Sequence, residues 1–596
     1  MNAARHKAIP LIVCVVLLFL IALGLFAYTV ELRRPWYGTT GAIESWFSSG
    51  TLMFAKNWYR EGILHLKFAL YWYPHSVEFP TLESRNVYTS YPPGSVIPIY
   101  LIGKLLGHEP TLATVMNYNL LNHFLIAFLL ALTILVLARQ FRYNDFDAPV
   151  SYFDAFILAL IPILLELLTP APIYHHMMGY FGDQAVMLLF AAYVFLEVLR
   201  DSMSERTRRL LSFVQTLIAF AGILTDYLFV FVALCVYLKR LARGEIGKRP
   251  GVFLTKSLSF WFSFALGGIL FVVQLAYFNG FENINMKFRQ QTGMARGKFL
   301  SLSTDNYFWT RHMPRGYGET GVFLIWASLL CFLAVAFYLL LRFLVRKRAN
   351  PMTARILAVA FMLMMPGFCH AFFLRAYNSN PIHYFSALRF SLMFATVPFV
   401  LIPLLVLSCI NTNGMWLSPA RIRAWVRRCP LQRAPRWPAG TFPPEWSLTP
   451  LLLLAAAAYQ VHAQYPEILP QFKAMIPSAN QPATADFIAA NTGYEDVLFT
   501  WNATIEQSES FLWMAYSMKR VYFAGSVKEI YEQLKDIHEE YVVNILSKSA
   551  NAPPVPSDLA ELAARAFDRR TWEDVRMDKI RKQDFLAYCK ELGIRN

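Results

Sequence analysis

Residues 33–62 read RRPWYGTTGAIESWFSSGTLMFAKNWYREG, and residues 84–107 read SRNVYTSYPPGSVIPIYLIGKLLG. Both segments follow a long apolar run at 9–30, and both are too polar and too rich in Pro and Gly to cross a bilayer. The sequence therefore predicts a large loop outside the lipid, over residues 31–110.

The first segment of the loop has the spacing of an amphipathic helix. Trp46 and Trp58 fall on an apolar side, whereas Glu44, Lys56 and Arg60 fall among the polar positions. This pattern suits a helix that lies on a membrane surface.

The second segment contains a rigid corner. Tyr91-Pro92-Pro93-Gly94 combines two fixed φ angles with a permissive glycine and stands directly before a short apolar stretch. We expect a turn here, followed by a short helix. A rigid corner at a membrane surface is well suited to present a binding site.

The composition places the whole chain in the membrane class. Of its 596 residues, 56% are hydrophobic and only 16% are charged, which is too apolar for an ordinary soluble protein. The first apolar run, 9–30, follows Arg5 and Lys7 and lacks a convincing small-x-small cleavage site. We interpret it as a retained first helix rather than a signal peptide.

Eleven apolar runs predict a polytopic α-helical membrane protein, each run being close to the ~20 residues that a bilayer requires. The runs are 9–30, 112–138, 152–170, 183–199, 209–224, 227–241, 256–279, 320–343, 353–374, 386–410 and 448–464. Clusters of Lys and Arg fall in alternate connections, as the positive-inside bias requires of cytoplasmic loops. This parity places the N-terminus in the cytoplasm and the C-terminus outside it.

The tail, residues 481–596, predicts a small extracytoplasmic α/β domain after a membrane domain of residues 1–480. Helical patterns at 483–490 and 526–537 alternate with strand-like runs at 497–501, 520–523 and 541–546. A loop rich in Pro, Ala and Ser follows, and then a charged stretch that we read as a helix.

Charge is distributed unevenly between these parts. The tail holds 14 basic and 18 acidic residues, a net charge of −4, which leaves +20 on residues 1–480. Cytoplasmic loops account for most of that excess, so we expect no nucleic-acid partner. The seven cysteines are scattered without a CxxC pair, so neither a disulfide framework nor a zinc site is predicted.

Together these features resemble the GT-C superfamily of integral-membrane glycosyltransferases, such as protein O-mannosyltransferases and lipid A aminoarabinose transferases. The resemblance lies in an acidic outer loop, the Asn57-Trp58-x-x-x-Gly62 helix, the Pro92-Pro93 corner and Gly103-Lys104-Leu105-Leu106-Gly107. It implies an inverting enzyme that takes a sugar from a polyprenyl-phosphate donor. Its acceptor would be a glycan, a lipid or a protein.

The resemblance implies two candidate catalytic carboxylates. Asp183 opens the predicted helix at 183–199 and matches the acidic residue that GT-C enzymes place there; an ordinary N-terminal helix cap is the alternative. Glu44 is the only carboxylate early in the first outer helix, whereas the usual acidic position falls near Phe47 and Ser48. Either residue would deprotonate the acceptor or hold a divalent cation, Mg or Mn, as the candidate cofactor, with Glu78 and Glu83 in reserve.

Contacts to the donor phosphate are predicted from three regions. Tyr88, Tyr91 and Arg85 flank the Pro-Pro corner, and Arg296 and Lys298 belong to a predicted outer loop, 279–319, with six basic residues against three acidic ones. Contact with the acidic tail is an alternative role for that loop. His383 and Arg389 stand at the start of the tenth run, where an arginine should face a polar cavity rather than lipid, with snorkelling to the interface as the alternative.

Two other classes of function remain open. Glu166 and Asp226 fall at membrane depth and would serve as proton-relay residues in a transporter or lipid flippase, although Asp226 also suits a helix-to-helix turn. A non-catalytic assembly protein with a degenerated site would explain the unusual acidic position in the first loop. The expected location is an integral membrane protein of a bacterial inner membrane.

Overall fold

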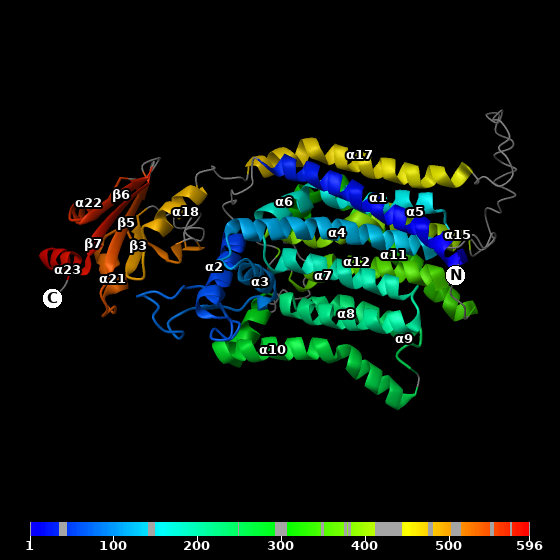
Figure 1. Ribbon diagram of the computed structural model, residues 1–596, viewed down its shortest axis with the longest axis horizontal. Coiled ribbons are helices and arrows are strands. Elements are labelled where there is room, and N and C mark those ends of the chain that lie inside the picture. The colour runs from blue at the N-terminus through cyan, green and yellow to red at the C-terminus, as the bar shows by residue number, and fades with distance from the viewer. Residues whose placement is uncertain are drawn as a thin grey trace. The chain divides into compact units, whose positions relative to one another are not determined.

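The computed structural model describes residues 2–34, 45–140, 150–247, 249–291, 307–346, 351–374, 378, 383–411, 444–474, 481–501, 514–515, 517–548, 554–572 and 575–594. The chain is a mostly helical integral membrane protein with a sheet-containing C-terminal region (Figure 1). It forms two compact units. Unit 1 comprises Met1–Leu32, Leu121–His175 and Asp183–Phe472, and unit 2 comprises Arg33–Leu120, His176–Gly182 and Lys473–Asn596.

Helices that lie wholly or largely in unit 1 follow the predicted apolar runs. They are α1 (Asn2–Arg33), α4 (Leu112–Gln140), α5 (Tyr152–Leu168), α6 (Pro170–Met178), α7 (Gly182–Arg200), α8 (Glu205–Thr225), α9 (Phe229–Ala242), α10 (Pro250–Gln291), α11 (Met313–Arg346), α12 (Pro351–Phe373), α14 (Ser391–Thr396), α15 (Ile402–Asn411) and α17 (Pro444–Ala474). Short 3-10 or π-helical turns join some of them: η4 (Phe308–His312), η5 (Tyr384–Phe390) and η6 (Val397–Leu401).

Eight helices in the described part of the chain are long and apolar enough to cross a membrane, and α5 with α6, bent by 55°, makes up to nine. The sequence predicted eleven spans, and the two others are helices that do not meet this criterion. Helix α9 has 14 residues, about 21 Å, which is shorter than the ~30 Å hydrocarbon layer. Helix α17 is long enough, but Gln460, His462 and Gln464 interrupt its apolar segment.

Glycines mark two of the predicted span boundaries. Gly280 lies inside α10 with φ 71° and Gly318 lies inside α11 with φ 68°, a left-handed conformation that glycine adopts without steric strain. The sequence ended one apolar run at 279 and began the next at 320. After Gly280 the chain remains helical up to Gln291, and before Gly318 it is helical from residue 307.

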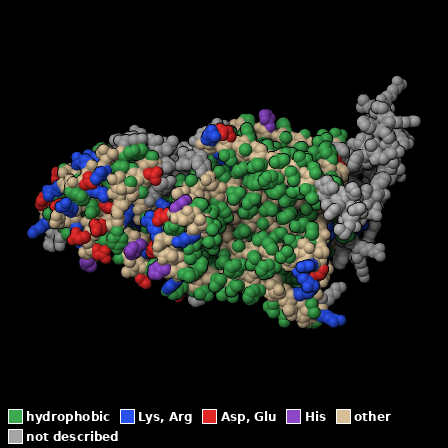
Figure 2. All heavy atoms as spheres, in the orientation of Figure 1, with side chains coloured by type: hydrophobic (Ala, Val, Ile, Leu, Met, Phe, Trp, Pro, Cys, Tyr) green, Lys and Arg blue, Asp and Glu red, His purple; other side chains and the backbone are tan. Residues whose placement is uncertain are grey.

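Figure 2 shows hydrophobic side chains covering the helices of unit 1. On α10 and α11 large apolar side chains point outward, for example Phe262 at 64% and Phe323 at 67% exposure. A continuous apolar surface of this kind on helices long enough to span a bilayer is typical of a lipid-facing surface.

The first outer loop of unit 2 begins with α2 (Ser45–Glu61). Its Asn57 donates to the carbonyl of Tyr71, and its Trp58 donates to the carbonyl of Ala69, both from buried positions. The Asn-Trp pair thus ties α2 to strand β1 (Leu70–Tyr71), which pairs with β2 (Val87–Tyr88). Leu52 and Met53 are buried too, so the apolar side of α2 packs against protein.

The Pro-Pro corner forms as the sequence predicts. Pro92 is extended, the turn η2 (Pro93–Ser95) follows, and α3 (Val96–Leu106) is the short apolar helix. Residues 179–180 join this region: the Tyr180 amide donates to Ser48, its carbonyl accepts from Thr51, and its hydroxyl donates to the Ser95 carbonyl.

The tail of unit 2 is a five-stranded mixed sheet with strand order β4-β3-β5-β7-β6. Its elements are α18 (Gln481–Ala490), β3 (Asp496–Thr500), β4 (Val521–Phe523), α21 (Val527–Leu534), β5 (Val542–Lys548), α22 (Ser557–Ala564), β6 (Asp568–Trp572), β7 (Val575–Arg581) and α23 (Lys582–Glu591). Strands β3, β4 and β5, which are parallel, lie where the sequence predicts them. The antiparallel hairpin β6–β7 was not predicted.

Candidate active site

Four polar side chains from distant parts of the sequence meet inside unit 1. Asp183 opens α7, Asp226 joins α8 to α9, His370 lies near the end of α12, and Arg389 lies in η5. We call these four residues the Asp183 cluster. The helix ends that carry them all lie at one end of the bundle.

Arg389 is the centre of the Asp183 cluster. Its Nε donates to Asp183 Oδ1 at 2.7 Å, and one Nη lies 2.6 Å from the same oxygen and 2.5 Å from Asp226 Oδ2. Asp226 Oδ1 also accepts from the Leu228 amide at 2.8 Å, which begins the turn into α9. Asp226 therefore closes that turn, as predicted, and in addition forms an ion pair.

The network orients His370 toward Asp183. Asn378 Nδ2 lies 3.3 Å from His370 Nδ1 and donates to the His370 carbonyl at 3.1 Å, so Nδ1 is the accepting nitrogen and Nε2 carries the proton. That Nε2 lies 3.4 Å from Asp183 Oδ1.

The Asp183 cluster is almost completely buried, with at most 1% of any of the four residues exposed. Charges at this depth are stable only when paired, and two carboxylates here share one guanidinium. Asp183 Oδ2 has no hydrogen-bond partner within the described residues. The cluster therefore has an excess of acid and one carboxylate oxygen without a partner among the described residues.

Of the predicted site residues, the structure brings Asp183 and Arg389 together. Arg389 lies inside an apolar run, and the sequence therefore predicted that it faces polar groups. In the structure it pairs with carboxylates and does not reach lipid. His383 precedes η5, half-buried, with its ring edge-on to Phe385 at 5.5 Å. Glu44, Arg296 and Lys298 lie outside the described residues.

Sequence reasoning missed His370 as a site residue and gave Asp226 only a turn or a relay role. His370 is a single histidine near the end of an apolar run, and no spacing links it to Asp183. His370 could have been found only as a polar residue at membrane depth, because such a residue needs a polar partner.

Tyr88 and Tyr91, the predicted phosphate contacts of the corner, pack in an aromatic cluster of unit 2. Both rings are edge-on to Phe181, at 5.4 and 5.8 Å, and Tyr88 is also edge-on to Trp72. Tyr91 is 3% exposed, whereas Tyr88 is half-buried.

Arg85 is held within the same loop. One Nη donates to Glu61 at 2.6 Å, Nε donates to the Tyr73 carbonyl, and the guanidinium lies over the Tyr71 ring. A pocket of about 390 Å³ adjoins it, lined by Glu61, His65, His75, Pro80, Thr81, Leu82 and Arg85. Arg85 is therefore a cation at the wall of a polar pocket.

The reserve carboxylate Glu78 also lies in unit 2. Burial raises its pKa to about 7, although a hydrogen bond with Tyr522 and the nearby Lys519 and Arg520 act in the opposite direction. Glu83 is exposed. Glu78 therefore connects the outer loop to strand β4 of the tail.

Glu166 lies inside unit 1, 1% exposed, near the end of α5. Ser391 donates to its Oε1 at 3.3 Å, and Oε2 has no hydrogen-bond partner among the described residues. Ser391 follows Arg389 by two residues, so this second buried carboxylate adjoins the segment that carries the Asp183 cluster.

The residues of the Asp183 cluster fit a divalent cation poorly. The described residues include no group of three or more His, Cys, Asp or Glu side chains able to hold a metal ion. Asp183 Oδ1 and Asp226 Oδ2 already face Arg389, whose charge opposes a cation.

No protein-family model and no curated protein matches this chain. Among solved structures, the oligosaccharyltransferase of Archaeoglobus fulgidus tethered to an acceptor peptide has TM-score 0.47 and 11% identity, over 90% of this chain and 69% of that one. ArnT from Cupriavidus metallidurans bound to undecaprenyl phosphate has TM-score 0.48 and 12% identity, over 95% and 97%. Its apo form has TM-score 0.44 and 14% identity.

These neighbours are GT-C glycosyltransferases, the superfamily that the outer-loop motifs resemble. The identities and TM-scores are too low to carry residue roles from them to this chain. Each of these solved structures is one that this chain is similar to, at 11% to 14% identity.

Proposed function

We propose that this protein is a membrane glycosyltransferase that moves a sugar from a polyprenyl-phosphate donor to an acceptor on the extracytoplasmic face. The observation that carries the proposal is the Asp183 cluster. A buried carboxylate with an unpaired oxygen, held beside a cation at one end of a membrane bundle, supplies both charges that glycosyl transfer from a phosphate requires.

In the proposed reaction the acceptor hydroxyl oxygen attacks the anomeric carbon of the donor sugar. The bond from that carbon to the phosphate oxygen breaks, and the polyprenyl phosphate leaves with the electron pair. Asp183 Oδ2 takes the hydroxyl proton, and Arg389 together with the basic residues Arg296 and Lys298 balances the charge on the leaving phosphate. Attack from the side opposite the phosphate inverts the anomeric configuration.

His370 is a positioning residue in this scheme. Its Nε2 lies 3.4 Å from Asp183 Oδ1, the oxygen that is not the basic atom in this scheme, and so helps to fix the carboxylate. Glu44 stays an alternative base, and Tyr88, Tyr91, Arg85, Arg296, Lys298 and His383 stay proposed donor contacts.

A transporter is the second candidate, because Glu166 and Asp226 are carboxylates buried in the helical bundle. In this structure Asp226 pairs with Arg389, and Glu166 accepts from Ser391. Proton-coupled uptake into vesicles that contain only this protein would favour this function.

The test is a transfer assay with the purified full-length protein, a polyprenyl-phosphate-linked sugar and a panel of glycan, lipid and peptide acceptors. We expect release of polyprenyl phosphate only when an acceptor is present. Undecaprenyl phosphate is the first lipid to test for binding, because it is the ligand in one ArnT structure. Absence of transfer with every acceptor, together with proton-coupled uptake, would overturn the proposal.

A further inference from the structure

A second polar region lies at the opposite end of α7 from the Asp183 cluster. Arg200 ends this helix, about 26 Å along the axis from Asp183 at ~1.5 Å per residue. A pocket of about 230 Å³ opens here, lined by Arg200, Ser212, Thr216, Arg240, Glu245, Ile246, Lys256, Ser259 and Phe260. These residues come from α7, α8, α9, α10 and the connection between α9 and α10.

The pocket is cationic. Three basic side chains line it, namely Arg200, Arg240 and Lys256, against the single carboxylate of Glu245. The hydroxyl-bearing residues Ser212, Thr216 and Ser259 complete the polar wall. Such a wall matches a phosphate group, which accepts from guanidinium, ammonium and hydroxyl donors.

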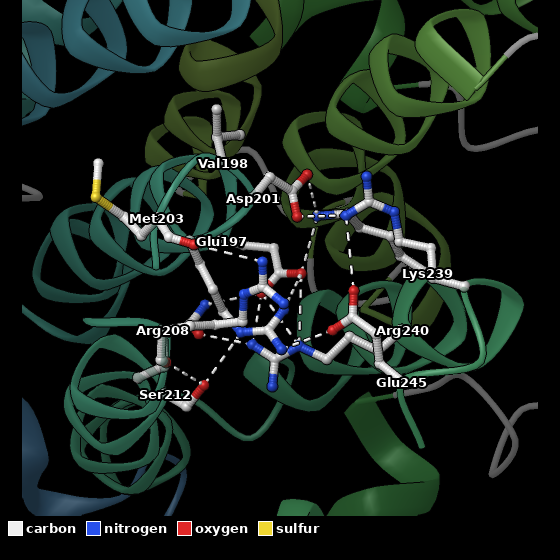
Figure 3. Close-up of polar contacts among 12 residues, drawn as sticks. Glu197, Val198, Asp201, Met203, Arg208, Ser212, Lys239, Arg240 and Glu245 are labelled. Atoms are coloured by element: carbon white, nitrogen blue, oxygen red, sulfur yellow. Dashed lines mark hydrogen bonds and ion pairs between the residues drawn. The ribbon is translucent and has the colours of Figure 1, made fainter. Parts of the chain in front are cut away.

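Buried carboxylates fix the arginines of the pocket in place. Figure 3 shows Glu197, Lys239 and Arg240 pointing toward one another. Glu197 is completely buried and pairs with Arg240 at 2.5 Å and with Lys239 at 2.9 Å, while Gln215 accepts from Arg240 at 2.6 Å. Arg240 therefore presents its charge without first losing rotamer freedom.

Arg200 is held in the same way, by Ser212 at 3.1 Å and Glu245 at 2.6 Å. Nearby Asp201 pairs with Lys239, Arg243 and Arg355. We call this network, with the pocket residue Lys256, the Glu197 cluster. It holds six cationic side chains, Arg200, Lys239, Arg240, Arg243, Lys256 and Arg355, against the three carboxylates Glu197, Asp201 and Glu245.

Beside the pocket the membrane surface is apolar. On α8, Phe213 and Leu217 are 61% and 53% exposed, and on α10, Leu258 and Phe262 are 63% and 64% exposed. Both helices are apolar enough to span a membrane, and the pocket residues on them lie about two to three turns from their N-termini. A molecule with its phosphate in the pocket thus has a lipid-facing surface next to it for its chains.

We propose that this pocket binds the phosphate of an anionic glycerophospholipid, whose acyl chains lie along α8 and α10. At about 230 Å³ the pocket is smaller than the ~300–1,000 Å³ of sites that enclose a whole small molecule, so it accommodates a headgroup. Basic pockets between membrane helices recognise anionic headgroups in this way. The adjoining apolar faces favour a lipid over free phosphate.

The test uses the full-length protein in detergent, with phosphatidylglycerol or phosphatidylcholine added, and native mass spectrometry to count retained lipids. We expect preferential retention of phosphatidylglycerol. The variant K256Q removes an exposed cation of the pocket and should lower this retention about fivefold. Among the contacts of the described residues, the Lys256 ammonium donates only to the Glu245 carbonyl. The matched control is R209Q, which removes a charge that is 81% exposed and outside the pocket.

Three outcomes would overturn the proposal. Equal retention of the two lipids would remove the headgroup preference. Equal effects of K256Q and R209Q would reduce the preference to general surface charge. Displacement of phosphatidylglycerol by inorganic phosphate would make free phosphate, and not a lipid, the occupant. Melting temperatures of the variants, measured in the same detergent, separate a local effect from loss of fold.

Discussion

The Asp183 cluster and the Glu197 cluster lie at opposite ends of α7, and both are networks of buried charge. In the first, two aspartates share Arg389, and Asp183 Oδ2 has no hydrogen-bond partner within the described residues. In the second, the single carboxylate of Glu197 contacts three cations, Arg200, Lys239 and Arg240. One end has an excess of acid and the other an excess of cation.

This difference distinguishes a carboxylate that can act on a substrate from a carboxylate that holds helices together. Both carboxylate oxygens of Glu197 contact cations, so Glu197 holds the helices together. A carboxylate with an unpaired oxygen keeps capacity for a substrate. The comparison therefore assigns reaction chemistry to the Asp183 end, and anchoring and lipid contact to the Glu197 end.

The largest expected effect is that of D183N. Amide replacement removes the proposed base, so the transfer rate should fall about 10²–10⁴-fold. The matched control is D201N, at the other end of the same helix, where a buried aspartate pairs with three cations. Once corrected for the amount of folded protein, D201N should retain transfer. An equal loss of transfer rate in both variants would contradict the assignment of reaction chemistry to the Asp183 end.

E197Q should have the largest effect on stability. It leaves Arg240 buried without its carboxylate and Lys239 with Asp201 alone, which costs about 3–5 kcal/mol. E205Q is the control, because Glu205 is 65% exposed and its ion pairs contribute about 1 kcal/mol or less. Thermal unfolding in detergent measures both. A similar, small loss in the two variants would show that the Glu197 cluster does not hold the helices.

H370L tests the positioning of Asp183. Loss of the imidazole should leave Arg389 as the only group of the Asp183 cluster that contacts Oδ1 and so loosen the carboxylate, lowering kcat about tenfold with little change in KM. H370Q, which retains an N–H donor, should recover part of the rate. If both variants also shift the melting temperature in proportion to the lost rate, His370 is only a packing residue.

The smallest effect concerns Glu78, a buried carboxylate outside the membrane bundle. Its pKa of about 7 lies above the usual 4.5, so the folded protein binds this proton more tightly than the unfolded chain. The stability that the protonated form contributes is complete below pH 4.5 and is lost as the pH rises through about 7. E78Q should flatten this decline in melting temperature by a few degrees or less. The exposed E83Q should leave it unchanged.

Much of the fold could be predicted because hydrophobicity alone specifies it. Apolar runs gave the helices of unit 1, β-branched and aromatic runs gave β3 to β5, and two prolines gave the corner before α3. Strands β6 and β7 were not predicted because their sequences, DRRTW and VRMDKIR, contain many charged residues and few apolar ones. Arg569 and Arg576 pair with Asp578 in the folded hairpin, a compensation that local patterns do not reveal.

The candidate site could be predicted only in part. Arg389 within an apolar run required a polar partner, and Asp183 at a helix start was a candidate on the resemblance. Their ion pair joins residues 206 positions apart, and Asp226 and His370 complete it from two other helices. Which polar groups meet inside a bundle depends on helix packing, and one sequence does not specify that packing.

The most direct test of the central claim is an experimental structure of the protein with a bound polyprenyl phosphate. We expect the phosphate within about 4 Å of the Arg389 guanidinium, at the Asp183 end of α7. A polyprenyl phosphate bound elsewhere, with no contact to Asp183, Asp226, His370 or Arg389, would contradict it.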